Sequence, residues 1–560
     1  MSDNLKLDPK QLYFIPMGGS EQFGVNFNLY SHQDRWLAID CGIGFADNRF
    51  PGIDILIPDV SFLEERADKL EGLIVTHAHE DHVGAVPRVW QRLRCPIYCT
   101  EFTAQVLQHK IREFPEARDA EIVIIKPGDR IELGPFTVEF IEVAHSIPDT
   151  CSVVVRTKVG NVLHSGDWNL DPNPVLGGKT DEKAFRALGD EKPRLTYIGD
   201  STNANVAGRS GSESEVEKGL AKVFKEHKGR IGVTIFASNV GRLQSICRAA
   251  KACDRRVAFA GRSLHTMVGA AKNCGYLQDI EDFVSEEDIG YLPEDKQVII
   301  LTGSQGESRA ALARVARGEH KNISFGHKDT VVFSARAIPG NEADINAVIN
   351  NLVGAGVTVV TPNDTKHIIH VSGHPRRDEV IDMFQWIKPS TVIPVHGERM
   401  QLEAHAEIAR GCQVEDVIVP SNGSVITLGP GAPAVVDHVE TGMEAIESRR
   451  VLDSGHKSIV ERRKFQYTGA LFITLAVSPR GDLLRYPDIS AVGLIDYEDE
   501  DGQELLLDLR DEIEDIMADM KRDDLYDDHA IHEEVRIGAR RLVSMLLGMK
   551  PMTYVHVVRV

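Results

Sequence analysis

The chain alternates between short apolar, β-branched runs and longer segments in which apolar residues recur every three or four positions. The short runs are typical of buried strands, and the longer segments are typical of amphipathic helices. In residues 1–210 the strand-like runs dominate, with several helical segments between them. From Ser214 onward helix and strand alternate, which indicates a parallel, doubly wound sheet with helices on both faces.

The expected elements after residue 210 fall into two groups separated by a polar, charged stretch at 447–463. The first group has helical spacing at 214–226 and 243–253, and strand-like runs at 231–236, 257–260, 297–302 and 330–334. The second group has strand-like runs at 470–477 and 552–560, and helical spacing at 512–520 and 533–547. This pattern predicts an alternating domain, then a linker, then a small separate C-terminal unit.

At 560 residues the chain is too long for one hydrophobic core, so we expect three or four domains. It contains no apolar run of about 18 residues, and its first residues have no apolar segment of signal-peptide type. Eight scattered cysteines form no Cys-x-x-Cys pair. We therefore expect a cytoplasmic protein with reduced thiols, in which each cysteine is a small buried apolar residue.

The formal charge of −21 is unusual for a protein that binds nucleic acid, because phosphate binding normally needs a basic surface. The acid is concentrated, however. Residues 496–528 hold sixteen acidic residues against Arg510, Lys521 and Arg522, which gives −13 and leaves −8 for the rest. This acidic run would be a solvated helix face or a contact for a partner. Charge therefore gives no positive support for a nucleic-acid substrate.

Three histidines and two carboxylates occur within six residues, His77-Ala78-His79-Glu80-Asp81-His82. The segment follows the apolar run 73–76 and precedes the helix-like run 83–93. A tight strand-to-helix loop can therefore bring several of these side chains to one point. Imidazole and carboxylate are ligands that zinc and manganese take. The alternative is a solvated polar loop, which the downstream residues disfavour.

Four further candidate ligands each follow an apolar, β-branched run: His145, Asp167, Asp200 and His396. In layered α/β folds, functional groups gather at strand ends, where loops leave a rigid sheet. Any one of these residues alone would more often be a core or capping residue. Five strand ends of this kind together predict a metal site.

The order of these residues resembles the metallo-β-lactamase superfamily, with His77-x-His79-x-Asp81-His82 followed by His145, Asp167 and His396. Further segments resemble the additional motifs of the β-CASP nucleases: Asp200-Ser201-Thr202, His370-Val371-Ser372-Gly373-His374 and Pro394-Val395-His396-Gly397-Glu398. The resemblance continues through 16–19, 302–307, 333–342 and 550–552. The whole pattern is similar to the bacterial ribonuclease J family and covers essentially the entire chain.

This resemblance implies an α/β fold: a metallo-β-lactamase αββα sandwich, an inserted doubly wound β-CASP domain and a small C-terminal α/β domain. The sandwich would comprise 1–210 and 365–446, the insertion 211–364, a linker 447–464 and the C-terminal domain 465–560. The chain has to return to the first domain near residue 365, because His396 must reach the other ligands.

The resemblance also implies two divalent ions, zinc or manganese, in each subunit. His77, His79 and His145 would hold one ion, Asp81, His82 and His396 the other, and Asp167 would bridge them. A carboxylate can bridge because it has two oxygens. Such a pair of ions lowers the pKa of water toward about 7 and clamps a phosphate oxygen. Glu80 is not a ligand in the family and receives no role.

The expected catalytic residues are His374, Asp200 and Asp81. His374 would stabilise or protonate the leaving group, because imidazole titrates near neutral pH; otherwise it is a loop histidine bonded to backbone. Asp200 would orient a metal-bound imidazole, or else cap the following segment.

A Gly/Ser-containing loop leads to His374, and exposed backbone N–H groups with a hydroxyl can form a phosphate cradle. The resemblance places the RNA backbone or a 5′-monophosphate against His370, Val371, Ser372, Gly373 and His374. Strand-end loops of the inserted domain would assist through Ser238, Asn239, Ser304, Ser334 and Arg336. Each of these five is as readily a turn or cap residue.

The implied function is a metal-dependent ribonuclease with 5′-to-3′ exonuclease and endonuclease activity, acting in rRNA processing and mRNA decay. Single-stranded RNA with a 5′-monophosphate is the expected substrate, and other RNA-decay proteins are further candidate partners. We expect a homodimer or homotetramer and no association with a membrane. A DNA nuclease is one alternative, although DNA-repair members of the group tend to have valine at the position of His374. A small-ester or thioester hydrolase would need neither the insertion nor the C-terminal unit. A non-enzymatic RNA scaffold would not need intact metal ligands.

Overall fold

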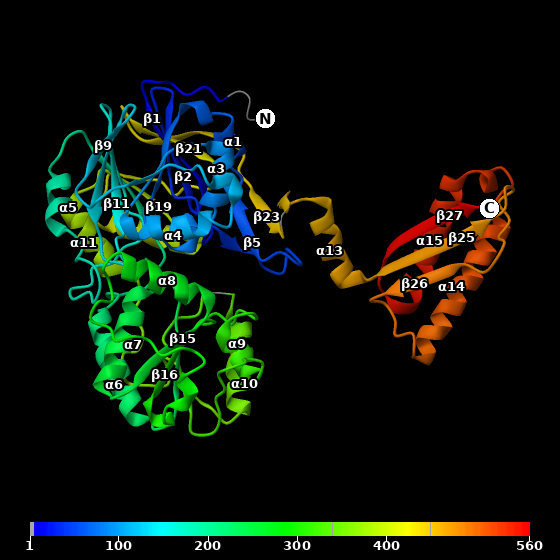
Figure 1. Cartoon of the computed structure of the whole chain (residues 1–560). Helices are drawn as coiled ribbons and strands as arrows, with labels where there is room; N and C mark the ends of the chain where they lie inside the picture. Colours follow the sequence, from blue (N-terminus) through cyan, green and yellow to red (C-terminus); the bar gives the residue numbers. More distant parts are fainter. Residues whose placement is uncertain (1–4, 339, 449) are drawn as a thin grey trace. The chain divides into compact units, whose positions relative to one another are not determined.

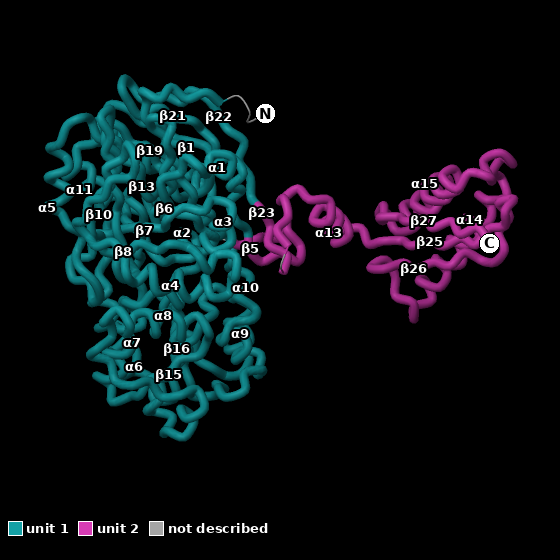
Figure 2. Tube along the Cα trace, turned by 45° about the horizontal axis from the view of Figure 1, so that its top comes forward, with its two compact units in different colours: residues 1–44, 56–443 teal, residues 45–55, 444–560 magenta. Residues whose placement is uncertain are grey.

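The computed structural model describes residues 5–338, 340–448 and 450–560, so Pro339 of the motif in 333–342 lies outside the described residues. The chain divides into two compact units (Figure 2). The first comprises residues 1–44 and 56–443, and the second comprises residues 45–55 and 444–560.

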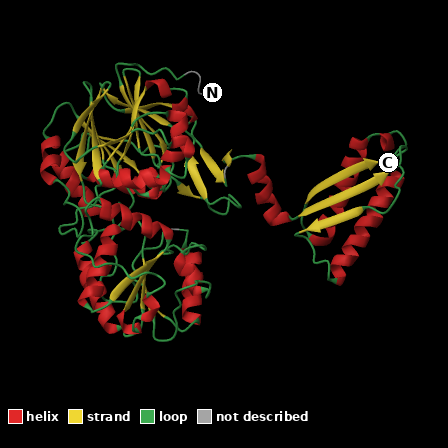
Figure 3. Ribbon diagram, in the orientation of Figure 1, coloured by secondary structure: helices red, strands yellow, loops and turns green. Residues whose placement is uncertain are grey.

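Two large sheets form the sandwich of the first unit (Figure 3). One has the order β22 (Ala434–His438), β21 (Ser424–Gly429), β1 (Leu12–Gly18), β2 (Phe27–His32), β3 (Arg35–Ile39), β6 (Leu70–Val75), β7 (Ile97–Cys99) and β8 (Ile122–Ile124). The other has the order β20 (Asp416–Val417), β19 (Thr391–Val395), β13 (Leu195–Asp200), β12 (Asn161–His164), β11 (Cys151–Arg156), β10 (Phe136–Glu142) and β9 (Arg130–Leu133).

The two sheets share one apolar core, to which Phe14 and Leu37 contribute from one sheet and Phe140 and Val153 from the other. The opposite face of the second sheet is covered by helices α5 (Glu182–Gly189), α11 (Arg377–Ile387) and α12 (Arg399–Gly411). Helices α3 (Val86–Leu93) and α4 (Glu101–Ile111) follow β6 and β7 in the chain. The αββα arrangement expected from the sequence is confirmed.

The inserted domain, green in Figure 1, is built on a five-stranded parallel sheet. Its order is β15 (Arg256–Ala260), β16 (Gln297–Leu301), β14 (Ile231–Thr234), β17 (Thr330–Phe333) and β18 (Thr358–Val360). One face packs on α6 (Glu213–Glu226), α7 (Val240–Ala252) and α8 (Arg262–Asn273). The other packs on α9 (Ala311–Ala316) and α10 (Glu342–Gly354). The predicted doubly wound sheet is therefore present, and α8 packs against α4 of the sandwich.

The second unit contains the sheet β26 (Asp488–Val492), β25 (Ala470–Val477) and β27 (Met552–Arg559), and helices α14 (Glu500–Asp519) and α15 (Asp528–Leu547) share its core. Helix α14 begins twelve residues earlier than the predicted start at Glu512. Its first half, 500–509, holds four acidic residues, and its buried residues are Gly502, Leu505 and Leu509. The stretch 447–464, expected as a linker, holds β24 (Arg450–Asp453) and most of helix α13 (Lys457–Thr468).

All eight cysteines are free thiols. Five are buried, as expected, but Cys253 and Cys274 are half-buried and Cys412 is exposed. Within the described residues, no helix has the length and apolar character needed to cross a membrane.

Candidate metal centre and active site

The strand ends picked out in the sequence meet at one edge of the sandwich. His77 follows β6, His145 follows β10 and Asp167 follows β12. Strands β13 and β19 run parallel with Asp200 opposite Val395, which places His396 beside Asp200. The backbone of His396 has a φ of 55°, a strained conformation for a residue with a side chain. Such strain is characteristic of functional sites.

The candidate ligand atoms form three overlapping groups, each with its atoms within 4.8 Å of one another; the third joins Asp167 and His396 to Asp200 and His374, and the other two contain the expected ligands. One group is His77, His79, His145 and Asp167, and the other is Asp81, His82, Asp167 and His396. Asp167 belongs to both: its Oδ2 lies 3.5 Å from His77 Nε2, and its Oδ1 lies 3.3 Å from His82 Nε2. The structure thus brings together all seven residues expected as ligands, with the carboxylate of Asp167 between the two groups.

Hydrogen bonds hold three of the imidazoles by the nitrogen that faces away from Asp167. These bonds join His82 Nδ1 to Asp40 Oδ2 (2.8 Å), His396 Nδ1 to Asn26 Oδ1 (2.9 Å) and His145 Nδ1 to the carbonyl of Gly373 (2.7 Å). Because each partner oxygen accepts, Nδ1 carries the proton and the Nε2 of a neutral ring keeps its lone pair. The rings are therefore oriented as metal ligands usually are.

Asp40 and Asn26 were missed by the sequence analysis, although Asp40 follows β3 in the same way that the other site residues follow their strands. The position of Asp40 next to His82 depends on the segment 41–43, which forms backbone hydrogen bonds with 80–82. Gly42 makes this approach possible, because a Cβ there would lie 1.7 Å from the carbonyl oxygen of Asp81. Glu80, which received no role, forms an ion pair with Lys110 of α4.

The chemistry of this donor set fits divalent cations. Asp167 Oδ1 is buried, and no hydrogen bond reaches it from the described part of the chain. The Nε2 atoms of His82 and His396 lie 3.3 and 3.6 Å from it. A buried carboxylate oxygen that accepts no hydrogen bond is unfavourable. A divalent cation among them removes that cost and uses every one of these atoms as a ligand.

Burial lowers the pKa of His77, His79 and His145, so these rings are neutral and available as ligands. Burial acts on His82 in the same direction, but the nearby carboxylates, Asp167 first among them, raise its pKa well above the ordinary value. A proton therefore competes with a metal ion at His82, and metal affinity has to fall as the pH falls.

His374 stands beside the metal ligands, with its Nδ1 at 2.8 Å from Asp200 Oδ2 and 3.8 Å from Asp167 Oδ2. Burial lowers the pKa of His374, but the charges of Asp200 and Asp167 outweigh it and raise the pKa to about 9. Asp200 was expected to orient a metal-bound imidazole; its carboxylate instead accepts the hydrogen bond of His374. The pair keeps a proton on His374 at neutral pH.

The loop 370–374 is hydrogen-bonded to one of the candidate metal ligands, His145. The Gly373 carbonyl accepts from His145 Nδ1 and from Asn169 Nδ2 (3.1 Å). The Ser372 hydroxyl accepts from Asn203 Nδ2 (2.8 Å) and from the backbone N–H of His374 (3.1 Å). A Cβ on Gly373 would lie 2.8 Å from His145 Cε1, so only glycine fits against the ring. The loop therefore has a fixed distance from the ligand set.

The candidate residues of the inserted domain have different surroundings. Ser238, Ser304 and Ser334 follow the neighbouring strands β14, β16 and β17, at the carboxyl edge of the sheet. Ser334 is buried, and its hydroxyl donates to the carbonyl of Ile369 at 2.6 Å. Ser304 is buried as well.

Asn239 caps helix α7 by accepting from the backbone N–H of Arg242 at 2.8 Å. The side chain of Arg336 is exposed, and Ser238 is half-buried. Of the five candidates in the inserted domain, Arg336 and Ser238 are therefore the most accessible to a substrate.

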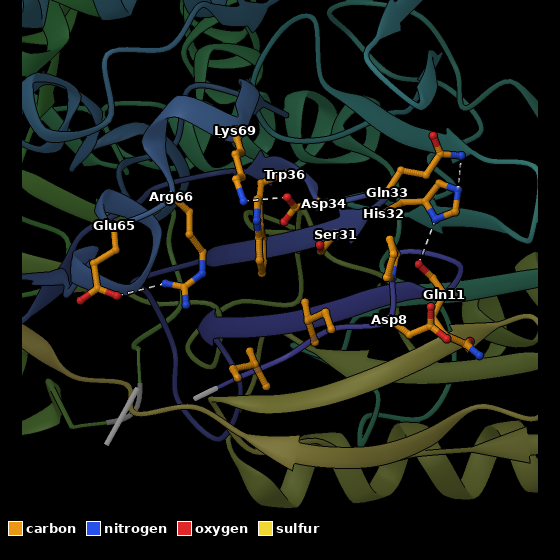
Figure 4. Close-up of a pocket in the computed structure, with 13 residues that line it drawn as sticks. Asp8, Gln11, Ser31, His32, Gln33, Asp34, Trp36, Glu65, Arg66 and Lys69 are labelled. Carbon is orange, nitrogen blue, oxygen red and sulfur yellow. Dashed lines mark hydrogen bonds and ion pairs between the residues drawn. The ribbon is translucent and has the colours of Figure 1, made fainter. Parts of the chain in front are cut away.

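A cavity of about 350 Å³ lies elsewhere in the first unit, beside the turn between β2 and β3 (Figure 4). Its walls include Trp36, Arg66 and the ion pair of Asp34 with Lys69. None of the candidate metal ligands or of the residues 370–374 lines this cavity. The candidate metal ligands therefore lie at the strand ends, outside this cavity.

Comparison with known proteins finds four family models that match successive parts of the chain. Family models match in order: the beta-lactamase superfamily domain at 35–182, the ribonuclease J beta-CASP domain at 228–352, the Zn-dependent metallo-hydrolase RNA specificity domain at 363–420 and the ribonuclease J C-terminal domain at 457–560. Ribonuclease J of Sinorhizobium meliloti is 40% identical over 556 residues, which cover 98% of each chain. Ribonuclease J of Mycolicibacterium smegmatis is 37% identical over 84% of each.

A crystal structure of an Enterococcus faecalis protein of unknown function has a TM-score of 0.52 at 16% identity, covers 75% of this chain and all of its own, and supports the fold alone. The sequence relatives go further, because the match to ribonuclease J of Sinorhizobium meliloti spans 98% of both chains at 40% identity. The chain belongs to the ribonuclease J family of metal-dependent nucleases, with metallo-β-lactamase, β-CASP and C-terminal domains.

Proposed function

We propose that this metal-dependent ribonuclease digests RNA from its 5′ end in the 5′-to-3′ direction, prefers a 5′-monophosphate, and also cuts RNA internally. Membership of the ribonuclease J family carries the coarser activity. The finer activities rest on the arrangement of the metal ligands, His374 and the loop 370–374.

Two divalent ions, zinc or manganese, fit the ligand set. We assign His77, His79 and His145 to one, Asp81, His82 and His396 to the other, and Asp167 to both, because its two oxygens face the two groups. When bound, such ions supply a Lewis acid that lowers the pKa of coordinated water toward about 7 and neutralises charge on a phosphate. Asp40, Asn26 and the Gly373 carbonyl keep the rings in place.

His374 is suited to protonate the 3′ oxygen that leaves when the phosphodiester is cut. Its pKa of about 9 keeps the ring protonated at neutral pH, and its Nδ1 is engaged with Asp200. Nε2 is then the nitrogen that can give a proton to the leaving group. Asp200 acts on the substrate only through His374.

The observation that carries the exonuclease proposal is the bond between the Gly373 carbonyl and His145 Nδ1. It ties the phosphate cradle 370–374 to a metal ligand, so a terminal phosphate held by the cradle lies at a set distance from the ions. Two additional phosphates would add bulk and about two negative charges in a confined space, where screening is poor. One phosphate at the 5′ end is therefore preferred over three.

The test uses matched RNAs that differ only in a 5′-monophosphate or a 5′-triphosphate, each with an internal label. We expect faster release of mononucleotides from the monophosphate RNA, and internal cleavage of both. Ser372→Ala should reduce the preference, because its hydroxyl fixes the loop through Asn203. Equal exonucleolytic rates for the two RNAs with the unaltered protein would refute the preference.

The cellular setting is part of the same proposal. RNA maturation and decay, including rRNA processing, fit an enzyme that reads the 5′ end. Free thiols at all eight cysteines fit the cytoplasm. We further propose assembly as a homodimer or homotetramer through the C-terminal unit, whose sheet exposes Phe472 and Tyr554 stacked at 5.4 Å between ring centroids.

A further inference from the structure

Arg242 is a fully buried arginine at the start of helix α7, with a relative exposure of 0%. Its Nε donates to Glu213 Oε1 at 2.7 Å and its Nη2 donates to Glu213 Oε2 at 2.9 Å, so the two residues form a bidentate ion pair. A charged guanidinium is costly to bury unless its charge is paired and its N–H groups are bonded. The sequence analysis gave Arg242 no role, and the ion pair alone uses only two of its five N–H groups.

The remaining N–H groups of Arg242 point to the chain that leads into the phosphate cradle. Nη1 donates to the carbonyl of Ser334 at 2.6 Å and to its hydroxyl at 2.9 Å, and it also reaches the carbonyl of Ile369 at 3.4 Å. Nη2 donates to the carbonyl of Val371 at 3.3 Å. The Ser334 hydroxyl in turn donates to Ile369. Two backbone carbonyls of 369–371 are thus held by one guanidinium.

His370, between these two carbonyls, also faces the guanidinium: its Nδ1 lies 3.3 Å from Nη1 of Arg242. Burial, and after it the charge of Arg242, lowers the pKa of His370 to about 3. The ring is therefore neutral and can accept from Nη1. Ser334 and His370, both expected as substrate contacts, are engaged by Arg242 inside the protein.

The partner Glu213 connects Arg242 to the metal ligands through a second route. The backbone N–H of Glu213 donates to Asp171 Oδ2 at 2.8 Å, and the backbone N–H of Asp171 donates to Asn169 Oδ1 at 3.0 Å. Asn169 Nδ2 then donates to the Gly373 carbonyl, the same oxygen that accepts from His145. The beginning and the end of the cradle loop are therefore fixed by one connected set of hydrogen bonds.

We propose that Arg242 is a positioning residue for 5′-end recognition: its guanidinium holds the segment 369–371 so that the cradle 370–374 keeps its geometry at the metal centre. The inference rests on the proposed function of this cradle. Lysine would keep the positive charge, but its three N–H donors are on a single nitrogen. That nitrogen cannot reach Glu213, Ser334 and two backbone carbonyls at the same time, as the planar guanidinium does. The arrangement therefore requires arginine.

The test compares Arg242→Lys with a matched control, Arg255→Lys, in the full-length, metal-loaded protein. Arg255 is also a buried arginine of the inserted domain, but its Nη atoms donate to the carbonyls of Gly229 (2.8 Å) and His227 (2.5 Å), which precede β14. Two RNAs of one sequence, with a 5′-monophosphate or a 5′-hydroxyl, are digested to obtain KM and kcat for each. Hydrogen exchange of 369–374 is measured without RNA.

For Arg242→Lys we expect KM for the monophosphate RNA to rise roughly tenfold, the scale of losing charge-assisted hydrogen bonds. KM for the hydroxyl RNA should rise much less, and exchange at 369–374 should increase. Arg255→Lys should change neither the ratio of the two KM values nor this exchange. Ser334→Ala removes only the hydroxyl between Arg242 and Ile369. It should raise KM for the monophosphate RNA and exchange at 369–374 by smaller amounts. This variant replaces Arg242→Lys in the test if Arg242→Lys does not fold.

Equal effects of Arg242→Lys and Arg255→Lys, or an unchanged exchange rate at 369–374 in both Arg242→Lys and Ser334→Ala, would overturn the positioning role. Failure of the proposed function looks different: the unaltered protein would digest the monophosphate and hydroxyl RNAs with the same KM. In that case exchange at 369–374 decides alone whether Arg242 holds the loop.

Discussion

The two compact units of the chain bury different kinds of side chain. Every polar or charged residue that is buried among the described residues lies in the first unit, at or before Ser424. The core of the second unit is built from apolar side chains such as Leu471, Leu509 and Val535. Buried polar groups stabilise a fold only when each has a partner, and they are otherwise costly. Their concentration in the first unit therefore indicates chemistry there, whereas the second unit is built for folding and contact.

The charge of the chain divides in the same way. Residues 496–528, with a net charge of −13, belong to the second unit, where they form α14 and the beginning of α15. The net charge of −21 therefore gives a poor description of the unit that contains the metal ligands. A bulk charge is informative about a site only when its location is known.

The contrast between the two units predicts that substitutions of the metal ligands have the largest effect on activity. His77→Ala or Asp81→Ala should reduce RNA cleavage below detection and lower the metal content at the same time, because the ligands of one centre act as a unit. The protection of backbone amides in 470–560 from hydrogen exchange should be unchanged. His438→Ala, at an exposed histidine of β22, is the control and should keep activity and metal. An Asp81→Ala protein with full metal content and near-normal cleavage would show that the site is assigned wrongly.

His374→Ala should retain its metal and slow the chemical step by roughly 10²–10⁴-fold, the usual contribution of a general acid. In the unaltered protein the acid form is lost as the pH rises through a pKa of about 9, so the single-turnover rate should fall above that pH. Asp200→Asn removes the charge that raises this pKa, and the fall should then move to lower pH. If the pH profile of the single-turnover rate were the same in both proteins, Asp200 would have no influence on proton transfer by His374.

Asp40→Asn should weaken metal binding by about 10–100-fold, the typical effect of removing a partner that orients a metal-bound imidazole. The amide can still occupy the space, but it no longer offers His82 Nδ1 a charged acceptor. Competition with a chelator of known affinity measures the change. Unaltered metal affinity would mean that His82 needs no such support.

Acid should destabilise the first unit selectively. Burial lowers the pKa of His405 to about 4, below the ordinary value of 6.5 for an unfolded chain. The unfolded chain therefore takes up the proton first, and stability that is present above pH 6.5 is lost as the pH falls toward 4, by at most about 3 kcal/mol. The histidines of the second unit are exposed or half-buried.

The measurement is proteolysis of the full-length protein at increasing urea, at pH 7 and pH 5, with fragments assigned to each unit. His405→Gln should flatten the loss for the first unit. If both units lost stability equally on acidification, the contrast between their cores would not control the response.

Removal of the residues after Arg450 should have the smallest effect on the metal centre, since the candidate ligands all lie before that point. Metal content per chain should be unchanged, whereas the assembly should become smaller in sedimentation. An unchanged oligomeric state in the truncated chain would show that the contacts between subunits lie in the first unit.

The sequence predicted those parts of the site that depend on local pattern. The expected ligands lie in segments that follow apolar runs, and the edge of a rigid sheet brings these segments together. The inserted sheet was predictable for the same reason, because each strand has its own apolar run between amphipathic helices.

The supporting partners were not predictable, because they depend on contacts between distant residues. Asp40 meets His82 through the close approach of Gly42, and Arg242 meets Ile369 and Val371 across more than 120 positions. Nothing in the local sequence of Arg242 distinguishes it from the exposed arginines of other helices. The length of α14 was underestimated because its first half has three adjacent leucines at 505–507 among acidic residues, which obscures the helical period.

The most direct test of a metal-dependent RNA hydrolase with two ions at Asp167 is a metal titration of chelator-treated protein. Manganese or zinc is added in steps, while bound metal per chain and cleavage of a 5′-monophosphate RNA are measured on the same samples. We predict that binding saturates at two ions per chain, that cleavage follows the second ion, and that Asp81→Ala abolishes both the second ion and cleavage. Saturation at one ion with full cleavage, or cleavage that persists in the chelated protein, would contradict this centre.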